Sequence, residues 1–292
     1  MDASLLLADA AKLTATVSTA EAPSVVTAAH AAPIGAARGG ARARPIPPAS
    51  GPVRFARYAF GPNRLGYCGP DEAGELFQQA TVGQEDERLR ALERQFEGAY
   101  PYLELIARSN GIEDPLDARV VEAYWLGSPL ADAVRPAALG PSLESRFRPR
   151  LRGDGWRWLA TTPEAGAVPV HAFHVLDVFP KLGLIRTGET DRALQVMDSC
   201  RIRWGRVLEV DGDWLVASVV PLELRGGKLR LGRPRPERVR GWVDGTGFVD
   251  DVAVGDVISI HWDWACERLD RRRLAALQSW TRRELDIANR TS

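Results

Sequence analysis

Two residues of this chain stand where their side chains suit a metal site. Cys200 opens the first of a run of short predicted strands, and His261 ends the last of them. A thiolate and an imidazole are both good ligands for iron, nickel or zinc, and the two ends of a small barrel can lie close together. A structural zinc site needs four ligands, so this pair suits transient holding of a metal, with a partner protein completing the coordination. The alternative is a buried packing cysteine and a histidine that caps a strand end.

Three further residues are second-tier ligand candidates. Cys266 is predicted at the start of a helix, whose positive end lowers the pKa of a thiol. His171 and His174 are spaced so that a helix places both rings on one face, where a metal can bridge them, with Asp177 three residues further on. The HExxH pattern of metalloproteases is absent. Ordinary packing or surface roles are the favoured alternative for all three.

Cys68 is the candidate nucleophile. It precedes a predicted helix within Gly66–Asp71, a position that can activate a thiol. An enzyme that uses Cys68, or the His171 and His174 pair, is therefore a second hypothesis for function. The sequence contains no phosphate-binding glycine loop and no G-x-S-x-G elbow, and a turn cysteine without a chemical role is the favoured interpretation.

A basic run raises a third hypothesis. Residues 225–240 carry seven cations and are followed by Trp242. On a small barrel, such a run with a nearby aromatic side chain is typical of proteins that bind single-stranded nucleic acid. A solvated hairpin, or a docking face for an acidic partner, is the interpretation we favour.

The C-terminal part must position Cys200 and His261, and its pattern is that of short strands. Asp211-Gly212 and Gly226-Gly227 are two-residue hairpin signals. Strands are predicted at 201–210, 214–222, 228–231, 238–243 and 256–262. So few short strands suit a small OB-like barrel. After Cys266 an apolar stripe with helical spacing predicts one amphipathic helix.

The middle of the chain is predicted to be mostly helical. Apolar residues recur at three- and four-residue spacing, and the signals at its start, Gly61-Pro62-Asn63 and Gly69-Pro70-Asp71, indicate turns. Asn63 and Arg64 are noted there as general binding candidates. Helices are expected at 70–81, 84–109 with a kink at Pro101, 114–127, 130–139, 171–179 and 191–197, whereas 156–159 is ambiguous.

Uneven composition suggests how the chain is divided. The first 50 residues contain 16 Ala, 5 Pro and no aromatic residue, whereas all five Tyr lie between Tyr58 and Tyr124 and six of nine Trp follow residue 200. We therefore expect a disordered lead at 1–52, a mostly helical domain at 53–197, and a barrel with a C-terminal helix at 198–292. The predicted fold class is α+β.

Charge and cysteine content exclude several classes of protein. Lys and Arg number 38 and Asp and Glu number 38, which argues against a dedicated DNA-binding or polybasic membrane protein. No apolar run reaches the ~18–20 residues of a membrane span, and no secretory signal pattern is visible. Three cysteines do not form a disulfide framework, so we expect reduced thiols and a cytoplasmic location.

Two segments of the C-terminal part resemble a known family. Residues 200–213, which read CRIRWGRVLEVDGD, are similar to the start of the HypC/HupF family, small barrel chaperones of [NiFe]-hydrogenase assembly. Residues 254–265, which read VGDVISIHWDWA, are similar to that family's later strand and its continuation. The family pattern begins Met-Cys, whereas here Ser199 precedes Cys200 and the cysteine is internal. The resemblance covers about 90 residues (200–292), and the part before it offers only a faint likeness to an uncharacterised bacterial family.

This resemblance implies a function for the chain. HypC-like proteins carry an iron fragment, which bears cyanide and carbon monoxide, from HypD to the hydrogenase large subunit. The chain is accordingly expected to be an accessory protein rather than an enzyme, with transient iron binding at Cys200 and His261. Its expected partners are a large-subunit precursor and a HypD-like maturation protein. Residues beside the two ligands are expected to contact these partners, namely Arg203, Trp204, Trp262 and Trp264.

Overall fold

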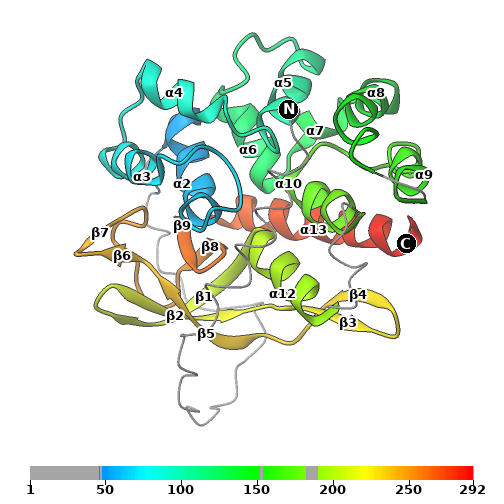
Figure 1. Ribbon diagram of the computed structural model, residues 1–292. Helices are drawn as coiled ribbons and strands as arrows, with labels where there is room; N and C mark the ends of the chain where they lie inside the picture. Colours follow the sequence, from blue (N-terminus) through cyan, green and yellow to red (C-terminus); the bar gives the residue numbers. More distant parts are fainter. Residues whose placement is uncertain (1–45, 47, 152–153, 182–189, 292) are drawn as a thin grey trace.

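The computed structural model describes residues 46, 48–151, 154–181 and 190–291. Helices from the first part of the chain lie over one side of a barrel-like sheet from the last part, and a long C-terminal helix completes the fold (Figure 1). This arrangement confirms the predicted α+β class. Most of the expected disordered lead, residues 1–45 and 47, lies outside the described residues.

Five strands form the barrel. They are β1 (Arg203–Asp211), β2 (Trp214–Val219), β5 (Arg235–Arg240), β8 (Val257–His261) and β9 (Trp264–Arg268). They are paired in the order β1-β2-β5-β9-β8, and β8 returns to β1. The seam between β5 and β9 is a single parallel pair, Arg240 with Trp264. The barrel is thus partly open, as OB-type barrels are.

Both predicted hairpin turns are present. Asp211 is paired with Trp214, and Gly212 has a φ of 54°. Arg225 is paired with Lys228 in a separate ribbon of β3 (Leu222–Arg225) and β4 (Lys228–Leu231), where Gly226 and Gly227 have φ values of 58° and 73°. Two successive positive φ angles are those of a type I′ turn, which few residues other than glycine adopt easily. A shorter ribbon of β6 (Trp242–Val243) and β7 (Thr246–Gly247) follows β5.

The helical part is more finely divided than the periodicity predicts. The expected helix at 84–109 is two helices, because Pro101 lies in the first turn of the second one rather than at a kink. The ambiguous 156–159 segment is helical. The expected helix at 171–179 contains a π-helical turn, η1, which begins at His174. In order, the elements are α2 (Gly51–Arg64), α3 (Ala73–Val82), α4 (Glu87–Glu93), α5 (Tyr100–Ser109), α6 (Ala118–Leu126), α7 (Pro129–Asp132), α8 (Pro136–Phe147), α9 (Asp154–Thr161), α10 (His171–Phe173), η1 (His174–Val178), α11 (Phe179–Lys181) and α12 (Thr190–Cys200).

The prediction of a turn at Gly61-Pro62-Asn63 is wrong, because these residues lie inside α2. Gly61 does not form a turn there; it allows α2 to pack closely against the backbone at the end of β8. A Cβ atom at this position would lie 2.7 Å from the backbone carbonyl oxygen of His261, at the end of β8. Glycine therefore lets α2 approach the barrel more closely than any other residue would.

The expected helix start at Cys266 is also wrong. Cys266 lies in β9 and is fully buried, and the C-terminal helix α13 begins only at Arg271 and runs to Thr291. The strand continues because Ile258 is paired with Arg268 in the β8–β9 ladder. The predicted apolar stripe of α13 is buried, with Leu277, Thr281 and Leu285 each no more than 5% exposed.

The helical part and the barrel share one apolar core. It includes Tyr58 of α2 together with Trp204 and Trp264 of the barrel. Polar groups also join the two parts, since the buried Tyr58 hydroxyl lies 2.9 Å from Ser259 Oγ and donates to Glu267 Oε1 at 2.8 Å. A second apolar cluster fills the barrel interior, with Val207, Leu215 and Ile260 among its members.

We predict that Gly61→Ala destabilises the protein by about 1–3 kcal/mol, because the added Cβ must displace the backbone at His261. Gly74→Ala in α3 is the matched control, since a Cβ there meets nothing within 4 Å. The control change should be neutral or stabilise the helix by up to ~1 kcal/mol. Denaturant unfolding measures both, and equal stability of the two variants would contradict the close approach.

Candidate metal centre

Three potential metal ligands come together at one place between the two parts of the fold. They are His171 at the start of α10, Cys200 at the end of α12 and His261 at the end of β8. One ligand atom of each lies within 4.8 Å of the others, and in the part of the chain that the structure describes no other such group of three is found. The structure thus brings Cys200 and His261 together and adds His171 to them.

Backbone contacts hold the three elements in this position. The Trp262 N–H donates to the carbonyl oxygen of Ser199 at 2.7 Å, which joins the end of β8 to the end of α12. The His261 ring lies against α2, because its Nδ1 is 2.6 Å from the Tyr58 carbonyl oxygen. His171 Nε2 is 2.9 Å from the Cys200 carbonyl oxygen, which joins α10 to α12.

His261 is oriented as a metal ligand would be. A carbonyl oxygen only accepts, so Nδ1 of His261 must carry the hydrogen and donate to Tyr58. The lone pair is then on Nε2, which is buried and has no hydrogen-bond partner among the residues that the structure describes. A hydrogen bond that fixes the tautomer of a ligating histidine is the usual arrangement at metal sites. A buried nitrogen without a partner also carries a desolvation cost, which a bound cation would remove.

His171 is differently placed. Its Nε2 donates to the Cys200 carbonyl oxygen, so its Nδ1 accepts from the Tyr124 hydroxyl at 3.2 Å. Both ring nitrogens are therefore engaged, and this ring must give up one of these bonds to bind a metal. His171 is thus the less available of the two imidazoles.

Burial sets the protonation of all three side chains. It lowers the pKa of His171 to about 4 and that of His261 well below its usual value. Burial also raises the pKa of Cys200 to about 12, although the neighbouring Trp262 side chain opposes this. Near neutral pH both imidazoles are therefore neutral and need lose no proton to bind a cation, whereas the thiol must lose one. A cation would supply the positive charge that a buried thiolate needs.

Aromatic side chains enclose the cluster. The Trp125 ring centroid lies 4.7 Å from that of His171 and 5.7 Å from that of His261. The Trp262 ring is stacked on Tyr67 at 4.0 Å between centroids. These rings limit access of water and so strengthen electrostatic interactions within the site.

The other ligand candidates do not join the cluster. His174 does not share a site with His171, because its ring packs between Tyr102, at 5.7 Å, and Phe147, at 6.1 Å between centroids. Burial lowers the pKa of His174 to about 3. Cys266 lies within the core, where burial raises rather than lowers the pKa of its thiol, and its Sγ lies 3.6 Å from the Trp264 carbonyl oxygen.

Three of the four expected partner contacts are buried. Trp204 and Trp264 are each 2% exposed and belong to the shared core. Arg203 is 4% exposed, with its guanidinium 2.5 Å from Glu237 and also bonded to the Trp262 carbonyl oxygen. These residues stabilise the fold and do not form an outer surface. Only Trp262 among the four is partly exposed.

Cys68 lies in the loop between α2 and α3. The buried Asn63 side chain donates to the carbonyl oxygens of Cys68 at 2.7 Å and Pro70 at 2.6 Å, so Asn63 shapes this loop. Arg64 pairs with Asp263, which joins the loop's base to the turn after β8. Cys68 is exposed, and it follows Tyr67, which stacks on Trp262.

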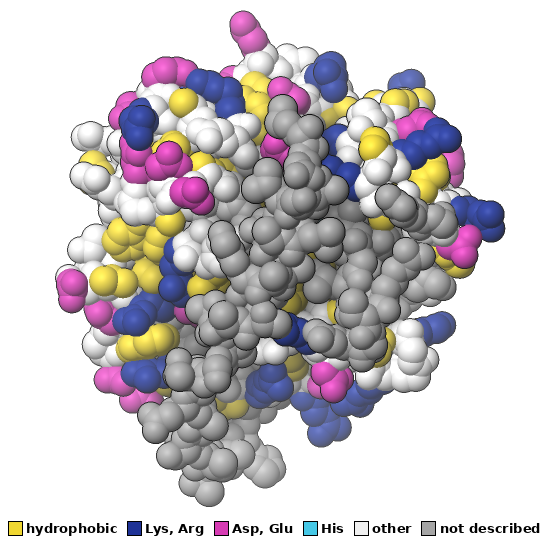
Figure 2. All heavy atoms as spheres, viewed as in Figure 1, with side chains coloured by type: hydrophobic (Ala, Val, Ile, Leu, Met, Phe, Trp, Pro, Cys, Tyr) yellow, Lys and Arg dark blue, Asp and Glu magenta, His cyan; other side chains and the backbone are white. Residues whose placement is uncertain are grey.

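The basic run is partly neutralised. Arg238 and Arg240 lie over the Trp214 ring, at 4.4 Å and 3.9 Å, and Arg240 also lies 3.9 Å from Asp213. Figure 2 shows acidic and basic side chains intermixed over the upper, helical part of the molecule. Two cations of the run are thus engaged with the ring of Trp214 on the neighbouring strand β2.

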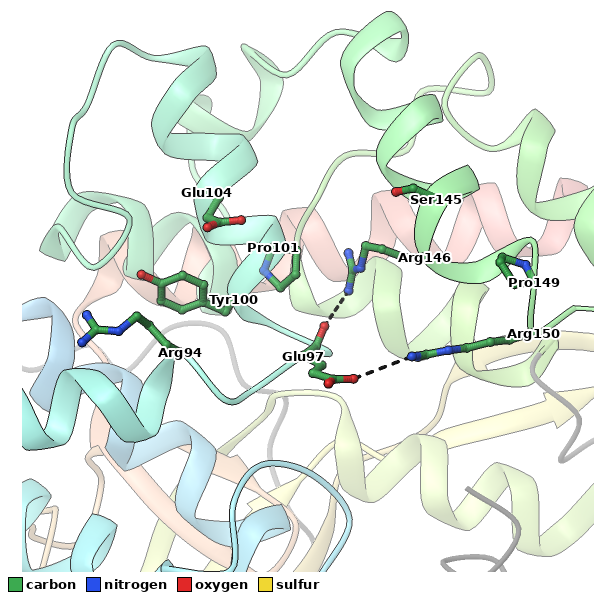
Figure 3. A pocket seen from close by; sticks show the side chains of 9 residues that line it. All are labelled: Arg94, Glu97, Tyr100, Pro101, Glu104, Ser145, Arg146, Pro149 and Arg150. Carbon is green, nitrogen blue, oxygen red and sulfur yellow. Dashed lines mark hydrogen bonds and ion pairs between the residues drawn. The ribbon is translucent and has the colours of Figure 1, made fainter. Parts of the chain in front are cut away.

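A surface cleft of about 610 Å³ lies elsewhere, between α5 and the end of α8 (Figure 3). Arg146 there bonds to the carbonyl oxygens of Glu97 and Gly98 and covers the Tyr102 ring. Arg150 lies 3.7 Å from the Glu97 carboxylate. Arg146 and Arg150 of the cleft thus already bond to other residues of the protein. None of the three clustered ligands lines this cleft.

Comparison with known proteins places the chain in a family. No helix among the described residues is both long and apolar enough to cross a membrane. No curated protein matches the sequence, and no solved structure matches it. One family model does match, over residues 47–292, and this span includes all three clustered ligands. The chain therefore belongs to DUF6390, a family of unknown function.

Proposed function

We propose that this protein is an accessory protein of [NiFe]-hydrogenase maturation that holds an iron fragment at His171, Cys200 and His261. The observation that carries the proposal is the approach of these three ligand atoms to within 4.8 Å of one another. Cys200 and His261 are the residues that the HypC/HupF resemblance selects, although 60 residues separate them in the sequence. The barrel class that the resemblance implies is also consistent with the five-stranded ring.

Three donors suit cargo better than a permanent metal. A closed structural site has four protein ligands, whereas three leave a position for a ligand of the cargo or of a partner. Thiolate and imidazole are donors that iron accepts. The cargo's own cyanide and carbon monoxide would occupy the remaining positions on the iron.

The third donor fits a departure from the family pattern. Because Ser199 precedes Cys200, no terminal amino group is available beside the thiol. His171, which the helical part supplies, offers a nitrogen within reach instead. In this proposal the helical part therefore contributes to the site directly, and the partners remain a HypD-like protein and the large-subunit precursor in the cytoplasm.

The direct test is an anaerobic pull-down of the full chain with a HypD-like protein and with a large-subunit precursor. We expect wild type to retain one of these partners together with iron, and Cys200→Ala to lose most of the iron, because the variant lacks the only thiolate of the cluster. Cys266→Ala is the control, since that thiol lies outside the cluster and should leave iron unchanged. Equal iron in wild type and Cys200→Ala would refute the proposal.

Metal affinity should depend on pH in a defined way. Because the pKa of the Cys200 thiol is about 12, each metal bound displaces its proton, and affinity should rise about tenfold per pH unit for that thiol between pH 6 and 8. The histidines add no dependence there, because the pKa of His171 is about 4 and that of His261 is well below 6.5. Titration with Fe²⁺ at several pH values should show a slope one proton smaller in Cys200→Ser. The same slope in both proteins would exclude the Cys200 thiol as a ligand.

A further inference from the structure

The loop of Cys68 lies directly beside the three clustered ligands. Tyr67, the residue before Cys68, stacks on Trp262, and Trp262 follows His261. The Trp262 N–H donates to Ser199, the residue before Cys200. One tryptophan thus joins the loop of Cys68 to the ends of α12 and β8, where two of the ligands lie.

One buried nitrogen of the site, His261 Nε2, lacks a hydrogen-bond partner among the described residues. His261 is 1% exposed and lies beside Cys200 and His171. A bound cation would accept the lone pair of this nitrogen. Thiophilic cations such as Fe²⁺ or Zn²⁺ bind four ligands at the corners of a tetrahedron. The cluster supplies three of them.

We propose that Cys68 is the fourth ligand, which closes over a bound Fe²⁺ or Zn²⁺ and can be exchanged for a partner's ligand. This inference rests on the site of the proposed function: Cys68 adds a second thiolate while the site holds a simple Fe²⁺ or Zn²⁺, and the cargo's own ligands or a partner's ligand displace it. Cys68 is not among the three atoms already within 4.8 Å of one another, so its thiol moves inward when the metal binds. Each of the two thiols loses its proton as it binds.

The movement is one of the Cys68 side chain, because hydrogen bonds hold the loop backbone in place. Asn63 holds the carbonyl oxygens of Cys68 and Pro70 and leaves the Cys68 side chain unconstrained by these bonds.

Cobalt provides the test, because Co²⁺ reports thiolate ligands through a sulfur-to-metal charge-transfer absorption. The full chain is titrated anaerobically with Co²⁺ as wild type, Cys68→Ser, Cys200→Ser and Cys266→Ala. We expect the absorption per bound metal to fall by about half in Cys68→Ser and to be unchanged in Cys266→Ala. Cys68 is exposed, so Cys68→Ser should unfold at the same denaturant concentration as metal-free wild type.

The outcomes separate the two proposals. Full absorption in Cys68→Ser with reduced absorption in Cys200→Ser would overturn the role of Cys68 and leave the three-ligand site intact. Full absorption in Cys200→Ser, or no Co²⁺ binding by wild type, would overturn both. A second readout is alkylation of the exposed Cys68 by iodoacetamide, followed by mass spectrometry. Bound Co²⁺ should protect Cys68 in wild type but not in His261→Ala, and equal labelling with and without metal would also overturn the inference.

Discussion

The approach of α2 to the end of β8 is the contact on which the arrangement of the site depends. Gly61 permits it, because any Cβ there would meet the His261 carbonyl oxygen. The same helix then supplies the Tyr58 carbonyl oxygen that fixes the His261 tautomer, and its Tyr58 hydroxyl bonds to Glu267 within the barrel. A short distance between two backbones therefore determines both how the two parts pack and which nitrogen of His261 faces Cys200 and His171.

The three side chains of the cluster are uncharged near pH 7, because burial shifts their pKa values away from neutrality. Two imidazoles with lowered pKa values and a thiol with a raised one are all neutral near pH 7, so no uncompensated ion is buried. The cost of removing water falls instead on single polar atoms, His261 Nε2 above all. Under the proposed function this balance favours release of the iron, because the site without it is already close to electrostatically neutral.

Local patterns predicted local structure, and contacts between distant segments escaped them. The Asp211-Gly212 and Gly226-Gly227 turns followed from the backbone angles that glycine allows. The apparent turn at Gly61 was a helix, because the glycine serves packing against another segment. The sequence predicts Cys200 and His261 as a pair, but it pairs His171 with His174, since spacing along one helix says nothing about the segment opposite. The roles of Tyr124 and of the Tyr58 carbonyl had no sequence signal at all.

The three ligands come from three segments that only the finished fold brings together. Two of them belong to α10 and α12 and the third to the barrel, and the shared core of the two parts lies around them. Contacts between residues so far apart in sequence form late, after the entropy of closing long loops has been overcome. A partly folded chain therefore has no complete cluster, and in the proposed function loading with iron becomes a checkpoint that only correctly folded molecules pass.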